Sequence, residues 1–80
     1  MEEKKVIVYS TPTCPFCHKA KEFLAAHNVP FEDVDVASDQ ARAKEMVEKS
    51  GQLGVPVIDV AGVIIIGFDE AALQKELHLQ

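Results

Sequence analysis

Apolar residues in this chain fall into short runs that are separated by polar turns. The first run, Lys5 to Tyr9, is rich in Val, Ile and Tyr and ends at Thr11-Pro12, which predicts a short buried strand. From Pro15 to about His27 the apolar residues recur at helical spacing, and Asn28 and Pro30 predict the end of that helix. One face of this helix consists of Phe16, Ala20, Phe23, Leu24 and His27, of which we expect His27 to be a surface or boundary residue.

The middle of the chain predicts a second strand and a second helix. Imperfect alternation and β-branched residues favour a strand from Phe31 to Val36. We expect Ser38 to cap the next helix, with Asp39 suited to the positive end of its dipole. The helix is expected to run to about Lys49 and to end at Ser50-Gly51. Its buried residues are expected to be Ala43, Met46 and Val47.

The last third of the chain predicts a hairpin and a final helix. Only Ala61-Gly62 separates the strand runs Pro56 to Val60 and Val63 to Ile66, which indicates a tight antiparallel turn. The final helix follows Gly67 and Asp69, with Ala72, Leu73 and Leu77 on its inner face. The predicted order is therefore β-α-β-α-β-β-α, an α/β fold. Its first three elements fit a right-handed parallel crossover. Because the final hairpin is antiparallel, we expect a mixed sheet.

Size and charge narrow the class of protein. The 80 residues predict a single domain over 1–80, with 48% hydrophobic and 26% charged residues and a net charge of −5. The basic residues are scattered, so we expect neither nucleic acid nor a membrane surface as a partner. We recognise no signal peptide or membrane span and therefore expect a cytoplasmic location. Two cysteines close together in such a chain favour a redox or metal role.

The strongest chemical signal is Cys14-Pro15-Phe16-Cys17, between the first strand and the first helix. Pro15 suits the first helical position, which makes Cys14 the expected N-cap. The sulfur would then face free backbone N–H groups and the positive end of the helix dipole. Such a place favours the thiolate, which is the nucleophilic form of cysteine.

The spacing of the two cysteines also allows a disulfide. Residues three apart on a helix lie about 5–6 Å from each other, within the roughly 4.4–6.8 Å that disulfide Cα atoms need. Cys17 lies one turn into the helix and should be more buried than Cys14. We therefore expect Cys14 to attack a substrate disulfide and Cys17 to resolve the mixed disulfide, leaving a reversible Cys14–Cys17 bond.

Three alternatives compete with this interpretation. The cysteines could be ordinary buried residues. A zinc site normally needs four ligands, and His18, His27 and His78 show no paired ligand spacing. Cys14 to His18 also matches the haem-attachment pattern C-x-x-C-H, which would suit an exported chain. We expect no resident metal, a surface position for His18, and solvated side chains for Lys19 and Lys21.

Two further motifs lie later in the chain. In Gly54-Val55-Pro56-Val57, the proline either simply opens a strand or follows a cis bond that turns the backbone of Val55 toward the cysteines. In Gly67-Phe68-Asp69, Gly67 permits close approach of another backbone and Asp69 suits a helix cap. A simple cap and turn explains the last motif equally well in isolation.

Together the three motifs, in this order and spacing, resemble the glutaredoxin family over nearly the whole chain. The resemblance implies a thioredoxin-like fold, a four-stranded mixed sheet flanked by helices. It implies dithiol–disulfide exchange at Cys14 and Cys17 and a cis bond before Pro56. It further implies that Val55 pairs its backbone with the substrate and that Tyr9 and Phe16 flank the site, with Pro15, Pro56 and Tyr9 as supporting residues.

The resemblance does not point to a single electron donor. Glutathione-using members commonly carry a lysine a few residues before the first cysteine, where this chain has Ser10-Thr11-Pro12-Thr13. Gly54 and Phe68 also replace a common threonine and glycine. Gln52 and Asp69-Glu70 match residues that can contact glutathione. The substrate or glutathione contacts implied are Thr11, Phe16, Gln52, Val55, Gly67, Phe68 and Asp69.

The Gly-Phe pattern is similar to the glutaredoxin-like hydrogen donors of ribonucleotide reductase, which a thioredoxin-reductase-type flavoenzyme reduces. We therefore expect a monomer without bound cofactor that acts on disulfide-containing proteins, ribonucleotide reductase among the candidates. Either glutathione, as a co-substrate, or such a flavoenzyme would supply electrons. The alternatives are an iron–sulfur or metal carrier that uses Cys14 with glutathione, and a redox-sensing domain with one fixed partner.

Overall fold

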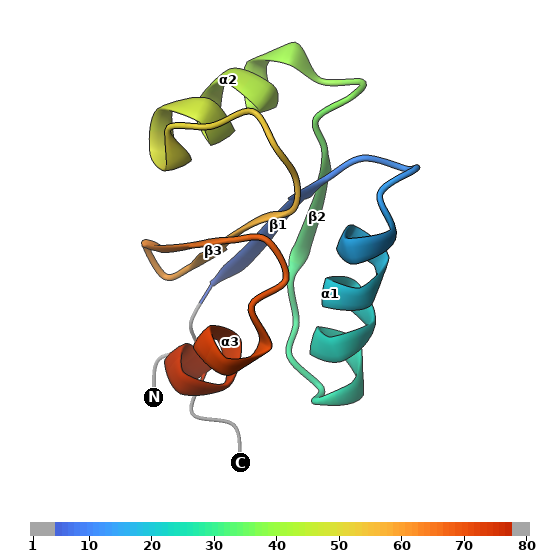
Figure 1. Ribbon diagram of the computed structural model, residues 1–80, viewed down its shortest axis with the longest axis vertical. Coiled ribbons are helices and arrows are strands. Elements are labelled where there is room, and N and C mark those ends of the chain that lie inside the picture. The colour runs from blue at the N-terminus through green and yellow to red at the C-terminus, as the bar shows by residue number, and fades with distance from the viewer. Residues whose placement is uncertain (1–4, 78–80) are drawn as a thin grey trace.

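The structure, a computed structural model, describes residues 5–77, so His78 lies outside the described part. Its seven elements follow the predicted order (Figure 1). They are β1 (Val6–Ser10), α1 (Pro15–Ala26), β2 (Glu32–Asp35), α2 (Gln40–Ser50), β3 (Val57–Val60), β4 (Val63–Ile66) and α3 (Glu70–Leu77). Among the helices of this part of the chain, none is long and apolar enough to cross a membrane.

The four strands form one mixed sheet in the order β2-β1-β3-β4. β1 is parallel to β2 and antiparallel to β3, and β3 and β4 form the predicted antiparallel hairpin. Ala61 and Gly62 in the hairpin turn both have positive φ angles, 51° and 97°, as a two-residue turn with the twist of the strands requires. Because β1 lies between two strands, all five of its residues are buried.

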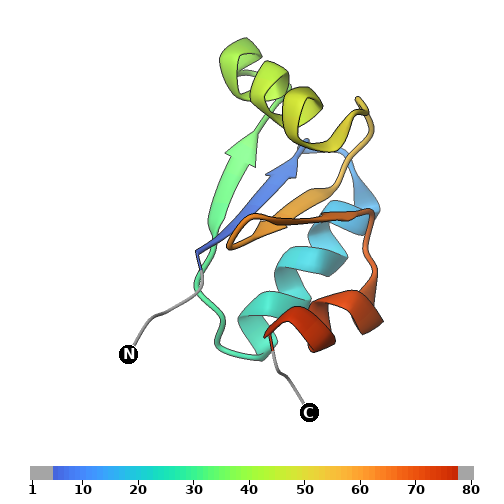
Figure 2. The same cartoon turned by 90° about the vertical axis from the view of Figure 1, so that its left-hand side faces the viewer.

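Alternation along β1 divides the core between the two faces of the sheet. Val6 and Val8 pack with residues of α1 and α3, whereas Ile7 and Tyr9 pack with residues of α2. Figures 1 and 2 show the same arrangement, with α2 on one side of the sheet and α1 and α3 on the other. Helices on both faces protect the central strands from water, and the loop after β1 emerges at one end of the sheet.

The buried face of α1 differs from the expected one. The residues that are fully buried are Cys17, Ala20 and Leu24, which keep the helical spacing of three and four. Phe16 lies one residue off this line and is 57% exposed, so the predicted face is not buried over its whole length. His27 is exposed, as expected, and its ring packs on Phe23 with 4.5 Å between ring centroids.

The cap of α2 is Asp39 rather than the predicted Ser38. The Asp39 carboxylate accepts the backbone N–H of Arg42 at 3.1 Å. Ser38 instead donates its hydroxyl to the Asp35 carbonyl at 3.4 Å, within the turn that leaves β2. Gly51 ends the helix in the left-handed conformation, at φ 76°, as expected. The predicted inner residues are Met46, fully buried, and Ala43 and Val47, which are half-buried.

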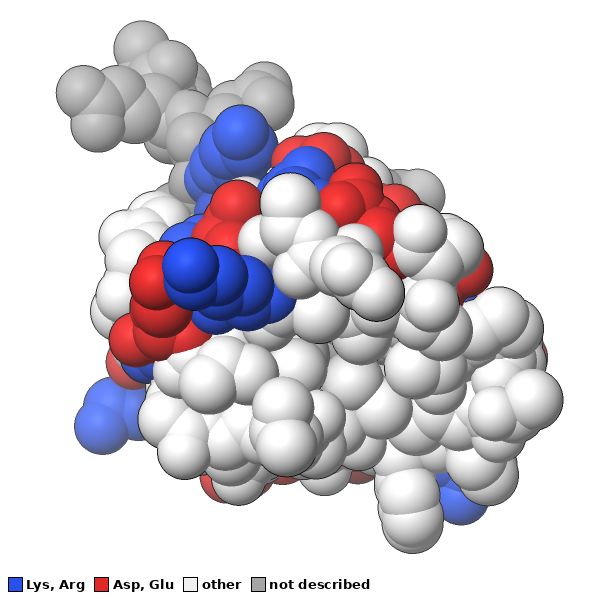
Figure 3. Space-filling model, turned by 90° about the horizontal axis from the view of Figure 1, so that it is seen from above, with Lys and Arg blue, Asp and Glu red and all other residues white. Residues whose placement is uncertain are grey.

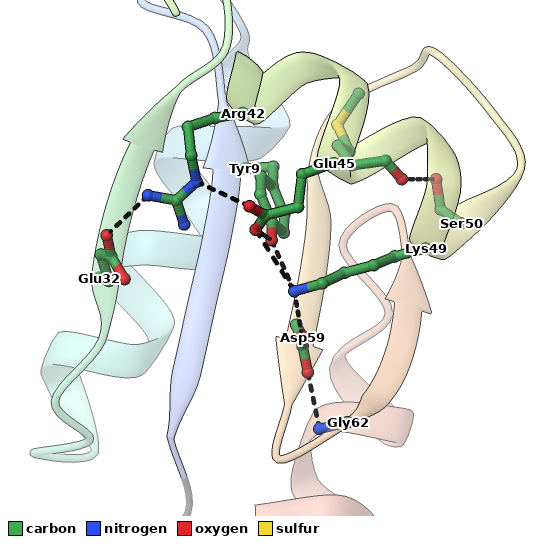
Figure 4. Close-up of polar contacts among 9 residues, drawn as sticks. Tyr9, Glu32, Arg42, Glu45, Lys49, Ser50, Asp59 and Gly62 are labelled. Atoms are coloured by element: carbon green, nitrogen blue, oxygen red, sulfur yellow. Dashed lines mark hydrogen bonds and ion pairs between the residues drawn. The ribbon is translucent and has the colours of Figure 1, made fainter.

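A polar cluster that no local sequence pattern predicts lies between α2 and the sheet (Figure 4). The buried Tyr9 hydroxyl donates to Glu45 and accepts from Lys49 at 2.8 Å. Lys49 also pairs with the buried Asp59 at 2.7 Å. The other Asp59 oxygen accepts the Gly62 N–H at 2.7 Å. The cluster therefore joins α2 to β1, to β3 and to the hairpin turn.

The charges of this cluster shift one another's pKa values. Desolvation lowers the pKa of Lys49, but its bonds with Asp59 and Tyr9 outweigh that effect and raise it. Burial and the bond to Glu45 raise the pKa of Tyr9. Arg42 extends the cluster by pairing with Glu45 at 3.2 Å and with Glu32 of β2 at 3.1 Å. These contacts hold the groups in the ionisation states that pair them.

Replacing Tyr9 by Phe should destabilise the fold. The substitution keeps the aromatic ring but leaves Glu45 and Lys49 without the hydroxyl between them. We expect the free energy of unfolding to fall by about 1–2 kcal/mol, which denaturant unfolding monitored by circular dichroism would measure. An unchanged free energy would show that the hydroxyl contributes nothing to joining α2 and β1.

The position of the α2 cap gives a matched pair of variants. Asp39→Ala removes the acceptor for the Arg42 N–H and should lower the free energy of unfolding by about 1 kcal/mol. Ser38→Ala removes the neighbouring exposed hydroxyl and should change it by less than about 0.5 kcal/mol. Thermal and denaturant unfolding of both variants measure the difference. A larger loss of stability in Ser38→Ala than in Asp39→Ala would show that Ser38 caps the helix.

Candidate active site

Cys14 lies at the start of α1, where its backbone is still extended, with φ −91° and ψ 111°. Its sulfur accepts the backbone N–H of Cys17 at 3.2 Å, and Pro15 occupies the first turn of the helix. The predicted N-cap role of Cys14 is therefore confirmed. A negative sulfur at this place is stabilised by the N–H group and by the positive end of the helix.

Cys17 has a different environment, although it lies in the same helical turn. Its side chain is fully buried, whereas Cys14 is half-exposed, and both are free thiols. Burial raises the pKa of Cys17 to about 12, and the Cys14 sulfur acts in the same direction. The backbone of Thr11 and the charge of Lys21 oppose that rise. At neutral pH Cys17 is thus a protonated thiol beneath a more accessible sulfur.

The loop between β1 and α1 is held by contacts to the first helical turn. The Cys14 N–H donates to the Thr11 carbonyl at 3.3 Å, which closes a tight turn. The Nε2 atom of His18 lies 3.1 Å from the carbonyl of Pro12, a contact in which the ring N–H donates. His18 is exposed, as expected, but it also braces this loop. The Cys14 sulfur is therefore presented from a fixed backbone.

The segment before β3 approaches Cys14 from the other side. The Val55–Pro56 bond is cis, and the Cys14 thiol donates to the Val55 carbonyl at 3.8 Å. The Pro56 carbonyl in turn accepts the N–H of Gly67 at 2.8 Å, and Gly67 has a φ of 78°. Three motifs that are far apart in the sequence thus meet in one place.

Two large apolar side chains are exposed in the segments next to the cysteines. Phe16, between them in sequence, has the Lys19 ammonium 5.3 Å above its ring. Leu53, in the loop between α2 and β3, is 80% exposed. Leu53 is not among the site residues predicted from the sequence. A lone leucine among glycines, outside any helical or strand period, is the signal that could have indicated an exposed apolar residue.

Other predicted site residues lie elsewhere or have other contacts. Tyr9 does not flank the cysteines at the surface, because its ring is fully buried and its hydroxyl bonds within the cluster beneath α2. Phe68 is half-buried, and its ring meets Phe23 edge-on at 5.9 Å. Asp69 is exposed and caps α3 by accepting the Ala72 N–H at 3.1 Å. Thr11 and Gln52 are half-buried.

Charged side chains are missing from the two chain segments that meet at Cys14. Residues 10–17 and 50–58 contain no Asp, Glu, Lys or Arg. Figure 3 looks down on the end of the molecule where these loops lie in Figure 1, and it shows charges gathered at one side of a broad uncharged area. Over residues 5–77 we find no group of three or more His, Cys, Asp or Glu side chains that converge to hold a metal ion.

Comparison with known proteins agrees with this arrangement. The glutaredoxin family model matches residues 6–65. The chain is 52% identical over 68 residues to an uncharacterised glutaredoxin-like 8.6 kDa protein in the rubredoxin operon of Clostridium pasteurianum, covering 85% of this chain and 91% of that one. It is 35% identical over 65 residues to glutaredoxin 3 of Escherichia coli K12, covering 81% and 78%.

Among solved structures, a mutant of the thioredoxin-like protein BC3987 superposes with a TM-score of 0.89 at 31% sequence identity, and each chain is covered completely. The family model spans three quarters of this chain, from β1 into β4, and includes both cysteines and the cis proline. The chain therefore belongs to the glutaredoxin family, whose members are thiol–disulfide oxidoreductases.

Proposed function

We propose that this protein reduces disulfides of other proteins by a dithiol mechanism in which Cys14 attacks and Cys17 resolves. One observation carries the proposal: within a single helical turn, one sulfur is half-exposed at the helix N-terminus and the other is fully buried. The first has the environment of a nucleophile that an external disulfide can reach. The second can reach the first sulfur but not an external disulfide.

The reaction balances without a resident cofactor. The Cys14 thiolate attacks one sulfur of the substrate disulfide, a mixed disulfide forms, and the other substrate sulfur leaves as a thiolate. Cys17 then loses its proton and attacks the Cys14 sulfur. The Cys14–Cys17 bond forms, the second substrate thiol leaves, and the substrate has gained two electrons. The cycle closes when an electron donor reduces the new disulfide.

Val55 gives the substrate a place to bind beside the sulfur. In the thiol state its carbonyl accepts the Cys14 S–H. Ionisation of Cys14 removes that proton and frees the carbonyl for a backbone N–H of the substrate. An extended substrate segment could then pair with Val55 as a short added strand, with the exposed Phe16 and Leu53 as apolar contacts.

The uncharged surroundings favour a flavoenzyme of the thioredoxin-reductase type over glutathione as the electron donor. Glutathione carries two carboxylates and an ammonium group, and such charges bind best to opposite charges or directed hydrogen bonds. Residues 10–17 and 50–58 supply no cation for the carboxylates. Gln52 offers an amide, and Lys19 is engaged over the Phe16 ring. We therefore propose weak binding of glutathione.

The proposed partners follow from this chemistry. They are disulfide-containing proteins, with ribonucleotide reductase as one candidate, and the flavoenzyme that returns electrons. The relative from Clostridium pasteurianum is named for its place in a rubredoxin operon, which supports partners among redox proteins. We propose that the protein acts as a monomer in the reducing environment of the cytoplasm, where such electron donors operate.

Single cysteine variants test the order of attack. Cys14→Ser should abolish disulfide reduction, since it removes the accessible nucleophile. Cys17→Ser should still react but remain trapped as a mixed disulfide, because no second thiol can displace the substrate. Insulin reduction and mass spectrometry of the trapped species measure the two effects. Normal turnover by Cys14→Ser would refute the mechanism, and trapping by Cys14→Ser instead of Cys17→Ser would reverse the roles.

The electron donor is tested by offering the oxidised protein two complete reducing systems. We expect NADPH with thioredoxin reductase to reduce it faster than NADPH, glutathione reductase and glutathione. Thr11→Lys places a cation before Cys14 and should raise the glutathione-dependent rate several-fold. Ser38→Lys makes the same charge change in the exposed turn before α2 and serves as the control. A parent chain that glutathione reduces faster would overturn the assignment of the donor.

A further inference from the structure

The buried thiol of Cys17 presents a chemical difficulty for the proposed reaction. Only the thiolate attacks a disulfide, and burial raises the pKa of Cys17 to about 12. At neutral pH very little of it is ionised. A group near Cys17 that favours the thiolate would therefore directly increase the rate at which the mixed disulfide is resolved.

Lys21 is the cation that the fold places near Cys17. It follows Cys17 by four residues on α1, so both side chains lie on the same side of the helix. Its side chain is only 20% exposed, contrary to the expectation that it is solvated. Its ammonium lies 3.1 Å from Asp33 of β2, which holds the charge against the sheet.

Asp33 is itself held in place from β1. Its other carboxylate oxygen accepts the hydroxyl of Ser10 at 2.9 Å, and Ser10 is fully enclosed, with 2% exposure. Ser10 directly precedes Thr11, whose backbone also stabilises the Cys17 thiolate. A chain of contacts thus runs from the end of β1 through β2 to α1 and ends at Lys21, whose positive charge acts on Cys17.

We infer that Lys21, fixed by Asp33, is a positioning residue that supplies positive charge to the buried Cys17 and accelerates its attack on the Cys14 mixed disulfide. This inference rests on the proposed function, because it concerns the second step of the dithiol reaction. Lys21 touches neither substrate nor the reacting sulfur in this role. It acts through the electrostatic potential at Cys17.

Few other charges face Cys17 from the elements packed around it. The strands on that face contribute Val6, Val8, Ile58, Val60 and Ile65, which are uncharged. On α1 itself His18, Lys19 and Glu22 are exposed and point away from the core. Cys14 and the Asp33 that pairs with Lys21 are further titratable groups at this end of the core. On α3, which packs on the same face of the sheet, and at its cap, Asp69, Glu70 and Lys75 are exposed and Glu76 is half-buried. The polar cluster beneath α2 lies on the opposite face of the sheet.

The second step can be observed with dithiobis-nitrobenzoate, an aromatic disulfide with a coloured leaving thiolate. Cys14 attacks it, and one coloured thiolate leaves as the mixed disulfide forms. Cys17 loses its proton to water and attacks the Cys14 sulfur, and the second coloured thiolate leaves. The first phase thus reports Cys14, and the second, which is independent of reagent concentration, reports Cys17.

In the parent chain the second phase should accelerate about tenfold per pH unit between about pH 6 and pH 8, because the thiolate fraction rises with pH far below the pKa of Cys17. Lys21→Gln should slow this phase about two- to fourfold across the range, with the same slope. The loss is smaller than the drop in thiolate fraction, because a more basic thiolate is also a stronger nucleophile. The first phase should not change.

Two variants separate charge from structure. Lys21→Arg keeps the positive charge and should restore the second-phase rate to near the parent value. Lys44→Gln makes the same charge change at an exposed position of α2 and should leave both phases unchanged. Lys21→Met provides a second neutral variant if Lys21→Gln does not fold, which thermal unfolding would show.

The outcomes are distinct. A second phase in Lys21→Gln as fast as in the parent would overturn the inference, and so would equal slowing by Lys21→Gln and Lys21→Arg, which would indicate a structural role. A parent chain with a first phase but no second would instead refute the proposed dithiol reaction. Slow resolution in the neutral variants with recovery in Lys21→Arg supports both proposals.

Discussion

The site depends on one contact, the hydrogen bond from the Cys17 N–H to the Cys14 sulfur at the first turn of α1. This contact makes a sulfur atom the cap of a helix, a place that favours negative charge. It requires that the chain leave β1 in a fixed direction, turn within four residues and enter a helix at once. The central position of β1 and the turn from Thr11 to Cys14 meet that requirement.

The same helical turn separates the two sulfurs by depth. Cys14 stands at the surface because a cap residue precedes the helix, while Cys17 points into the core with Ala20 and Leu24. Depth alone therefore distinguishes an accessible nucleophile from a protected thiol. In the proposed reaction, a buried, protonated Cys17 reacts only after Cys14 has brought a disulfide within its reach. The proposed order of the two steps thus follows from packing.

Charged residues are placed differently around the two sulfurs and beneath α2. Beneath α2, the cluster of Tyr9, Glu45, Lys49 and Asp59 joins the helix to the sheet. The loop that leads from α2 to β3 carries Val55 to the Cys14 sulfur, so the anchoring of α2 also supports the site. Around the sulfur itself the loops are uncharged. Lys21, which is paired with Asp33, supplies a positive charge that acts on the buried Cys17.

Short local patterns in the amino-acid sequence determine much of this protein. The order of elements, the hairpin at Ala61-Gly62, the end of α2 at Gly51 and the cap formed by Cys14 each follow from a few neighbouring residues. Turn chemistry and helix capping act over three or four positions, which a sequence displays directly. For the same reason the pair Cys14 and Cys17 could be recognised together with its expected order of attack.

Tertiary structure alone decided the features that need partners from distant segments. The hydrogen bonds of the Tyr9 hydroxyl with α2, the pairing of Lys49 with Asp59 and that of Lys21 with Asp33 each join residues of different elements. So does the contact between Cys14 and Val55, which are 41 positions apart. A charged or polar residue has the same appearance in a sequence whether it is solvated or paired. Its environment depends on which strands and helices are neighbours, and packing of the whole chain determines that.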